Sequence, residues 1–430
     1  MRNRTMRLNY HGNYAGSHRG AWKADPNTPA EFDLDYYVKF AQIAERGLFD
    51  GIFYAADLAA QGPNRSTYAG LDPVVLSTAL ATSTERIGLA ATISTTFNEP
   101  FNVAKAMSTL DHISCGRAAW NIVTSYEPMA APNFGMTELP PKNERYERAQ
   151  EFVEVVLKLW ESWGPTALTS RGNGAATALC ESAINPINHA GRYFNVRGPA
   201  QTPRSPQGRP VLFQAGASEE GKAFASRVAD GIFCVALELT VAKAFYAEMK
   251  RRVKNANRDP DSVQILPGLY VYLGSTEEEA KRALAAQSDT TEALQHLAVK
   301  LSTSVDELIL DETVPKKILD RALFNPQSDG HTRSLVELLR RERLTVREFL
   351  KRQPLRGPHR VLVGVPEMIA DWLETWFLEK AADGFNIGNL THETLTIFVE
   401  EVVPRLQARG LFRREYEGMT LRENFCGDAR

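Results

Sequence analysis

The sequence contains few cysteines and no long apolar run, and both shortages limit what the protein can be. Only four cysteines occur among 430 residues, and they lack the spacing of a zinc site. We therefore expect reduced thiols, no metal site and a cytoplasmic protein. No stretch approaches the roughly 18 apolar residues of a membrane-spanning helix. The start, MRNRTMRLNYHGNY, has no apolar run behind its basic residues, so we do not expect a secretory signal.

Excess charge of one sign is missing too, because 50 basic residues oppose 52 acidic ones. This balance gives no strong field for binding nucleic acid or an anionic membrane. The sequence also lacks a G-x-S-x-G elbow, an H-E-x-x-H motif, a P-loop and a catalytic cysteine–histidine pairing. No G-x-G-x-x-G follows the first predicted strand, which argues against the alternative architecture, an open doubly wound sheet.

What is present is an alternation of short β-rich runs with amphipathic segments, the pattern of parallel βαβ units. The segment 33–47, for example, places Leu34, Val38 and Ala41 on one helical face. Eight strands are predicted, at 6–10, 49–57, 86–94, 116–125, 209–216, 230–236, 263–274 and 384–389. Eight strand–helix units predict an α/β fold, a (β/α)₈ TIM barrel, as a single domain over residues 1–430.

Two segments do not fit the ring of the barrel. Residues 164–208 are rich in Gly, Pro, Asn and Ser, which indicates an excursion with turns. Residues 285–360 are polar and mostly helical in pattern, and they read as an insertion between strands seven and eight. Insertions after barrel strands stand over the active site, so we interpret this one as a lid or a partner surface. We find no internal repeat.

Functional residues of a TIM barrel lie at the C-terminal ends of its strands. In this sequence hydroxyl, amide and small side chains dominate those ends. They are Asp57 after the second strand, Ser94, Thr95 and Thr96 after the third, Asn121, Thr124 and Ser125 with Tyr126 at the fourth, and Gln214 to Ser218 at the fifth. Such a lining favours holding a polar cofactor over direct covalent chemistry.

The string QAGASEEGKAFA, residues 214–225, gives the most specific indication. A strand runs into Gly216, Ala217 and Ser218 and then directly into a helix. Free N–H groups and the serine hydroxyl at that helix start form a site for an anion such as phosphate. The same pattern also fits an ordinary serine N-cap followed by acidic residues. From these residues alone, the sequence indicates a barrel enzyme with a phosphorylated ligand.

Four longer strings resemble those of one family and occur in order along the chain. They are LDHISCGRAAWNIVTS (110–125), NERYERAQEFVEVV (143–156), GRYFNVRGPAQTPRSPQGRPVLFQAGAS (191–218) and RGLFRREYEGMTLRENF (409–425). The sequence is similar to the nitrilotriacetate monooxygenase, dibenzothiophene-sulfone monooxygenase and pristinamycin synthase family, within the bacterial-luciferase-like flavin monooxygenases. The likeness extends from residue 6 to residue 425 and is weakest over residues 285–360.

The resemblance implies an enzyme that receives FMNH₂ from a separate NAD(P)H:flavin reductase. In such enzymes the reduced flavin reacts with O₂ to form a peroxide that oxygenates a small organic substrate. Cleavage of a C–N, C–S or carbon–halogen bond often follows. A homodimer or homotetramer is also implied. Three alternatives remain: a deazaflavin-dependent oxidoreductase, a flavin-degrading enzyme and a non-catalytic flavin-binding protein.

The resemblance also implies roles for individual residues. Those expected to hold FMN are Asp57, Ser94 and Thr95 along the isoalloxazine ring, Asn121, Thr124 and Ser125 beside the flavin, and Tyr146, Ala217 and Ser218 at the phosphate. Lys142 stands where relatives often have a histidine, and it could reach the phosphate as a point charge. The candidate catalytic residues are His11, His18 and Asn121, with the two histidines as proton donors or substrate-orienting groups.

Each of these histidines could instead be an ordinary solvated side chain. Three departures from the family pattern touch the pocket rim or the cofactor edge. They are Ser17 before His18, Lys142, and the string GFNIGN at 384–389. The flavin half of the site is therefore expected to follow the family, whereas the substrate cannot be inferred from any relative.

Overall fold

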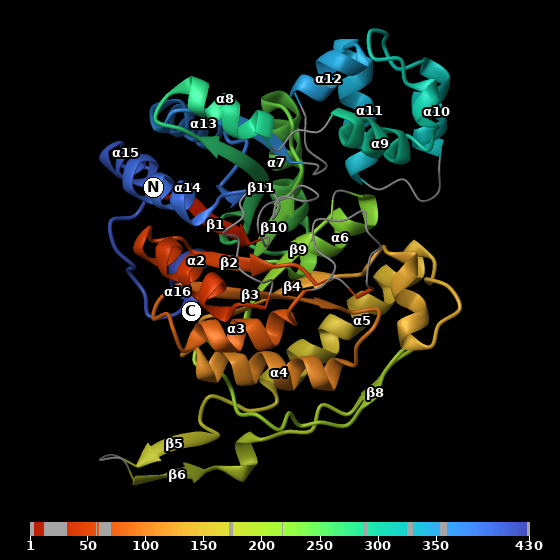
Figure 1. Ribbon diagram of the computed structural model, residues 1–430. Coiled ribbons are helices and arrows are strands. Elements are labelled where there is room, and N and C mark those ends of the chain that lie inside the picture. Colours follow the sequence, from red (N-terminus) through yellow and green to blue (C-terminus); the bar gives the residue numbers. More distant parts are fainter. Residues whose placement is uncertain are drawn as a thin grey trace.

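Parallel strands close into a barrel in the computed structural model of the protein, which describes residues 4–12, 32–56, 58–59, 70–171, 175–216, 218–286, 290–324, 330–352 and 359–427. The order around the barrel is β1–β2–β3–β4–β9–β10–β11–β13, and β13 pairs with β1 (Figure 1). These strands span Arg7–Gly12, Gly51–Tyr54, Gly88–Ser94, Ala118–Val123, Val211–Ala215, Gly231–Cys234, Gln264–Leu273 and Gly384–Gly388. The predicted TIM barrel is confirmed.

Amphipathic helices cover the outside of the barrel (Figure 1). In α2, Asp33 accepts a hydrogen bond from the Asp35 N–H as the N-cap, and the face with Phe40 and Ala44 is buried. The surrounding helices are α2 (Leu34–Arg46), α3 (Pro73–Ala81), α4 (Pro100–Ile113), α5 (Lys142–Glu161), α6 (Glu219–Val228), α7 (Leu239–Asn255), α8 (Glu277–Ala286), α13 (Pro366–Leu378), α14 (His392–Ile397) and α15 (Val403–Ala408).

The two insertions form separate structures. The first contains two hairpins, β5 (Leu168–Arg171) with β6 (Ala175–Leu179) and β7 (His189–Ala190) with β8 (Asn195–Val196). The second contains four helices that pack around an apolar cluster of their own, and Figure 1 places them to one side of the barrel. They are α9 (Thr290–Lys300), α10 (Lys316–Phe324), α11 (Gly330–Glu342) and α12 (Val346–Arg352). The chain returns through β12 (Arg360–Gly364), which pairs with the second half of β11.

Aromatic side chains fill the interior of the barrel. Phe53 on β2 and Phe213 on β9 meet with ring centroids 4.5 Å apart, although two strands separate β2 from β9 around the wall. Such a contact must cross the interior. Leu421 and Phe425, from the short C-terminal helix α16 (Leu421–Cys426), belong to the same buried cluster. The C-terminal segment therefore closes the end of the barrel at which the strands begin.

A recurring Asp–Gly pair precedes three of the barrel strands, at Asp50, Asp230 and Asp383. Each carboxylate accepts a backbone hydrogen bond of 2.8–3.0 Å from the strand that pairs with its own. The donors are the N–H groups of Leu8, Leu212 and Ile265. Each carboxylate also pairs with a basic side chain. These aspartates thus fix neighbouring strands to each other. The Asp–Gly repeat was not predicted from the sequence.

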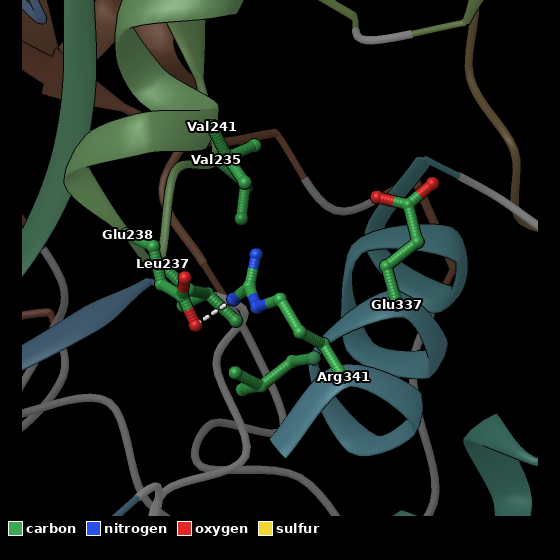
Figure 2. A pocket seen from close by; sticks show the side chains of 7 residues that line it. Val235, Leu237, Glu238, Val241, Glu337 and Arg341 are labelled. Carbon is green, nitrogen blue, oxygen red and sulfur yellow. Dashed lines mark ion pairs between the residues drawn. The ribbon is translucent and has the colours of Figure 1, made fainter.

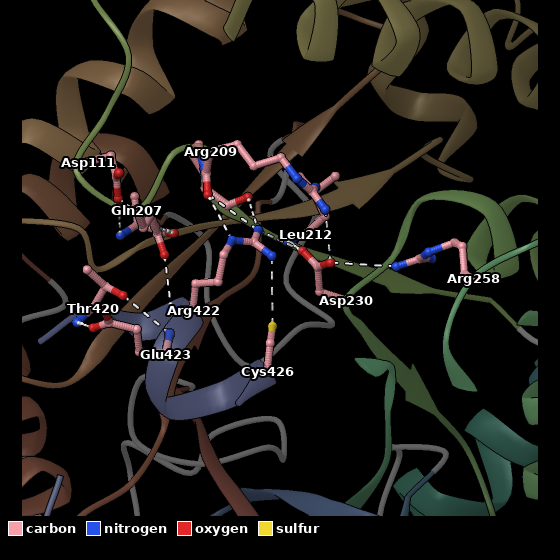
Figure 3. Close-up of polar contacts among 12 residues, drawn as sticks. Asp111, Gln207, Arg209, Leu212, Asp230, Arg258, Thr420, Arg422, Glu423 and Cys426 are labelled. Atoms are coloured by element: carbon pink, nitrogen blue, oxygen red, sulfur yellow. Dashed lines mark hydrogen bonds and ion pairs between the residues drawn. The ribbon is translucent and has the colours of Figure 1, made fainter. Parts of the chain in front are cut away.

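Asp230 has the most extensive of these networks (Figure 3). Its carboxylate lies 3.1 Å from Arg209, 3.0 Å from Arg422 and 3.6 Å from Arg258. Burial on its own would raise the pKa of Asp230, but the guanidinium groups of Arg209 and Arg422 hold it below its usual value. The carboxylate is therefore ionised and fully paired at neutral pH.

Two differences from the predicted elements have physical explanations. The predicted helix near 393–408 is interrupted by a π-helical turn at Phe398–Val402, because Pro404 has no N–H to continue an α-helical ladder. The strand β12 was not expected, because RVLVG at 360–364 follows a polar insertion and lies outside the ring of eight. None of the described helices is long and apolar enough to cross a membrane.

Candidate active site

Hydroxyl and amide side chains gather at the C-terminal end of the barrel, which we call the mouth. Ser125, just after β4, donates a hydrogen bond of 2.8 Å to the hydroxyl of Ser94 at the end of β3. Asn121 donates to Thr92 over 2.9 Å, and its carbonyl oxygen has no partner among the described residues. The structure therefore places Ser94, Asn121 and Ser125, three of the residues expected around a flavin ring, on or just after the adjacent strands β3 and β4.

The remaining candidates on these two strands hold the backbone together. Thr95 is buried, and its N–H donates to the carbonyl of Val123 over 2.9 Å. The neighbouring Thr96 hydroxyl donates to the carbonyl of Thr124 over 2.7 Å. Ser125 follows with a φ of 52°, in the left-handed region that non-glycine residues rarely adopt. This strained residue lies at the expected cofactor site, where such conformations concentrate.

The start of α6 meets α5 beside the mouth. Ser218 is the N-cap of α6, and its Oγ accepts a hydrogen bond of 3.1 Å from the Gly221 N–H. A methyl group added at Gly221 would lie 3.0 Å from the hydroxyl of Tyr146, and one at Gly216 would lie 3.2 Å from it. A side chain at either position would therefore crowd the hydroxyl of Tyr146 at the helix start. We call Tyr146, Gly216, Ser218 and Gly221 the cradle.

Lys142 lies next to the cradle but pairs with a carboxylate. Its Nζ is 2.9 Å from the carboxylate of Glu220, in the first turn of α6. This contact with Lys142 is the main reason that the pKa of Glu220 falls to about 2. Three predicted site residues, Asp57, His18 and Ala217, lie outside the described part of the chain.

His11 lies on the opposite side of the mouth from the cradle. Its ring is 5.7 Å from that of Phe233, and β11 and β13 separate their strands around the wall, so the contact crosses the interior. Burial lowers the pKa of His11 to about 4, so its imidazole is neutral at neutral pH. Its Nδ1 has no partner among the described residues. The His11 side chain is half-buried, so the alternative of an ordinary solvated histidine does not describe it.

His359, which the sequence did not single out, lies in the same place. Its ring stacks on Phe233 with centroids 5.1 Å apart and meets the edge of Tyr270 at 5.2 Å. The ring of His11 is 6.5 Å away. A lone histidine between a polar segment and a short strand gives no signal in a single sequence. Only the pairing of β12 with β11, and the space at Gly268 on β11, bring it to the mouth.

The helical insertion contacts the barrel beside the mouth. Arg341 on α11 forms an ion pair with Glu238, in the loop that follows β10 (Figure 2). The two residues line a small pocket together with Val235, Leu237, Val241, Glu337 and Leu338. The guanidinium of Arg360 donates to the Leu237 carbonyl over 3.0 Å, which links the same loop to β12. The insertion is thus attached at the strand end that carries Phe233.

Comparisons with known proteins identify the family of the chain. The model of the luciferase-like monooxygenase family matches residues 13–382. The chain is 39% identical to N-acetyl-S-(2-succino)cysteine monooxygenase of Bacillus subtilis, over 95% of this chain and 94% of the relative. It is 38% identical to nitrilotriacetate monooxygenase component A of Aminobacter aminovorans, over 98% and 96%. The structure of EDTA monooxygenase from Chelativorans sp. BNC1 superimposes with a TM-score of 0.80 at 32% identity, covering 98% of each chain. The resemblance predicted from the sequence is confirmed.

Proposed function

Because the chain belongs to the luciferase-like monooxygenase family, we propose that it is the oxygenating component of a two-component system that uses reduced FMN. A separate NAD(P)H:flavin reductase would supply the FMNH₂, and the substrate would be a small organic molecule. The observation that carries the proposal is the polar side of the mouth, where hydroxyl, amide and N–H groups converge. We call Ser94, Thr95, Asn121, Ser125 and Ser218 the hydroxyl half.

The cradle suits the phosphate of FMN. Backbone N–H groups at the start of α6, the hydroxyl of Ser218 and the hydroxyl of Tyr146 would all donate to phosphate oxygens. A side chain at Gly216 or Gly221 would fill the space beside the Tyr146 hydroxyl. Lys142 neutralises Glu220, whose charge would otherwise oppose a phosphate. A site built from hydroxyl and N–H donors permits the reversible binding that a delivered cofactor requires.

The end of the hydroxyl half that lies on β3 and β4 suits the isoalloxazine ring. The unpartnered Asn121 carbonyl and the paired Ser94 and Ser125 hydroxyls offer donors and acceptors to the ring heteroatoms. When bound, FMNH₂ would supply the electrons with which the enzyme activates O₂. Phe53 and Phe213 pack against each other in the barrel interior below the mouth, in a buried cluster that would form an apolar floor to the site. Neutral His11 can hold or transfer one proton at Nδ1, which has no partner among the described residues.

The cradle can be tested by two substitutions that remove one hydroxyl each, Tyr146→Phe and Ser218→Gly. Glycine is nearly as good an N-cap as serine, so Ser218→Gly leaves α6 almost unchanged. A hydrogen bond to a charged group contributes about 1.5–3 kcal/mol, so we expect FMN affinity to fall roughly ten- to hundred-fold in each variant. FMN titration followed by fluorescence measures this effect.

Tyr193→Phe is the matched control. The hydroxyl of Tyr193 donates to Glu147, an exposed residue of α5, the helix that also carries Tyr146. This variant should bind FMN like the unsubstituted protein. Unchanged affinity in Tyr146→Phe and Ser218→Gly would contradict the phosphate assignment.

The reaction can be tested by O₂ uptake with FMNH₂ and a panel of compounds. The panel contains N-acetyl-S-(2-succino)cysteine, nitrilotriacetate, EDTA, dibenzothiophene sulfone and riboflavin. We expect one O₂ consumed per product formed with at least one compound. Loss of riboflavin alone would support the flavin-degrading alternative. Hydride transfer with a reduced deazaflavin and no O₂ uptake would contradict the proposal.

A further inference from the structure

His359 begins the return from the helical insertion to β12, yet it lies inside the mouth. Its side chain is buried, with 9% relative exposure. The parallel stack on Phe233 has an interplanar angle of 17°, and the edge contact with Tyr270 has one of 71°. These contacts come from β10 and β11, so His359 covers two adjacent strands of the barrel. The residue is therefore held in a defined position and is not a surface histidine.

A glycine makes room for this ring. A methyl group added to Gly268 on β11 would lie 2.4 Å from the Nδ1 of His359, closer than atoms can approach. Any residue with a side chain at this position would push the imidazole away from Phe233. The sequence therefore has a glycine on β11 at the position that faces a histidine from the end of the insertion. This pairing indicates that the barrel accommodates the imidazole at the mouth.

The mouth is divided between two kinds of side chain. The hydroxyl half comes from the consecutive strands β3, β4 and β9 and the residues that follow them. The other half comes from β10 and β11, from β1 on the far side of β13, and from His359. We call His11, Phe233, Tyr270 and His359 the aromatic half. Since the proposed FMN contacts lie on the hydroxyl half, the aromatic half is left for the substrate.

We propose that His359 contacts the substrate and closes the aromatic half of the mouth, an inference that rests on the proposed function. Phe233 and Tyr270 offer apolar surface to the part of the substrate that carries the reacting atom. The imidazole of His359 is a polar group on this surface, and it is suited to hydrogen-bond a polar group of the substrate and so orient it. His359 also connects the insertion to the proposed substrate site, because it lies between the insertion and the start of β12. The insertion thereby becomes part of the substrate site.

Two substitutions separate the functions of the ring and its nitrogens. His359→Phe keeps a flat ring on Phe233 but removes both nitrogens, whereas His359→Ala removes the ring and admits water. Loss of a hydrogen bond with a partner left unsatisfied costs enough to raise the half-saturating substrate concentration about ten-fold in both variants. Without substrate, the electrons of FMNH₂ reduce O₂ to H₂O₂, and we expect faster H₂O₂ release only in His359→Ala. FMN affinity should stay within about two-fold in both, because the cradle lies on other elements.

His112→Ala is the control, an exposed histidine in the last turn of α4, at the opposite end of the barrel. Its FMN affinity and H₂O₂ release should match those of the unsubstituted protein. A fall in FMN affinity as large as that of Tyr146→Phe would place His359 on the cofactor and overturn the inference. Unchanged H₂O₂ release in His359→Ala would also overturn it, even if no panel compound is a substrate. If the unsubstituted protein does not bind FMN, the proposed function itself fails.

Discussion

The two ends of the barrel are built in opposite ways. At the end where the strands begin, Asp50, Asp230 and Asp383 are buried, and each is bonded to a backbone N–H and to a basic side chain. At the mouth, His11 and Asn121 each keep a buried polar atom without a partner among the described residues. These three carboxylates join strands at the first end, whereas these two atoms at the mouth have no partner among the described residues. Stability and function are thus separated along the barrel axis, as is typical of this fold.

The two ends also differ in backbone conformation and in their relation to the C-terminal segment. Ser125 at the mouth has a strained positive φ, and the surrounding contacts must offset its cost in free energy. At the other end, α16 inserts Leu421 and Phe425 into the interior, and Arg422 reaches Asp230. This explains why the string RGLFRREYEGMTLRENF belongs to the family pattern although it lies far from the mouth. Its role is to close the barrel.

The largest effect is expected from Asp230→Ala at the closed end. This substitution leaves three guanidinium groups around an empty position, and breaking such a buried pair costs about 3–5 kcal/mol. We expect the thermal unfolding temperature to fall sharply, whereas FMN affinity of the folded protein stays unchanged. Asp261→Ala, at an exposed aspartate in the short 3-10 helix Pro260–Ser262, is the control and should change little. Equal effects of the two substitutions would show that the network around Asp230 does not stabilise the fold.

The two ends should also respond to acid in separate pH ranges. Burial lowers the pKa of His11 from 6.5 to about 4, so its stabilising effect is complete above the unfolded value. That effect is lost as the pH falls toward about 4, because the unfolded chain binds the proton first. Asp230 also has a lowered pKa, and its contribution is lost only below its unfolded value of about 3.9. These two contributions to the unfolding free energy should therefore be lost in two successive steps, that of His11 first and that of Asp230 at lower pH.

Single substitutions assign these steps. His11→Phe should reduce the slope between pH 6.5 and pH 4 and leave the acid step in place. Asp230→Asn should remove part of the acid step only. If His11→Phe leaves the upper slope unchanged, the neutral imidazole at the mouth is not the group that titrates there.

The barrel could be predicted from the sequence because eight β-rich runs alternate with amphipathic segments and each run is bounded by turn residues. The hydroxyl half could be predicted as well, since hydroxyl and amide side chains directly follow β3, β4 and β9. His359 could not, because its place depends on a contact with Gly268, 91 residues earlier in the chain. The role of Asp230 was also hidden, since three arginines that reach it are spread over positions 209 to 422.

The smallest effect is expected from substitutions of Ser125, which test whether its strained backbone conformation contributes to FMN binding. Ser125→Gly and Ser125→Ala both remove the hydroxyl that donates to Ser94, but only glycine relieves the positive φ. Alanine in that conformation costs about 1–2 kcal/mol, so the glycine variant should unfold at the higher temperature. Lys380, with a φ of 54° beyond α13, provides the same pair of substitutions away from the mouth. If only the hydroxyl matters, Ser125→Gly and Ser125→Ala bind FMN equally. Weaker binding by the more stable glycine variant would mean that the strained backbone itself holds the cofactor site in shape.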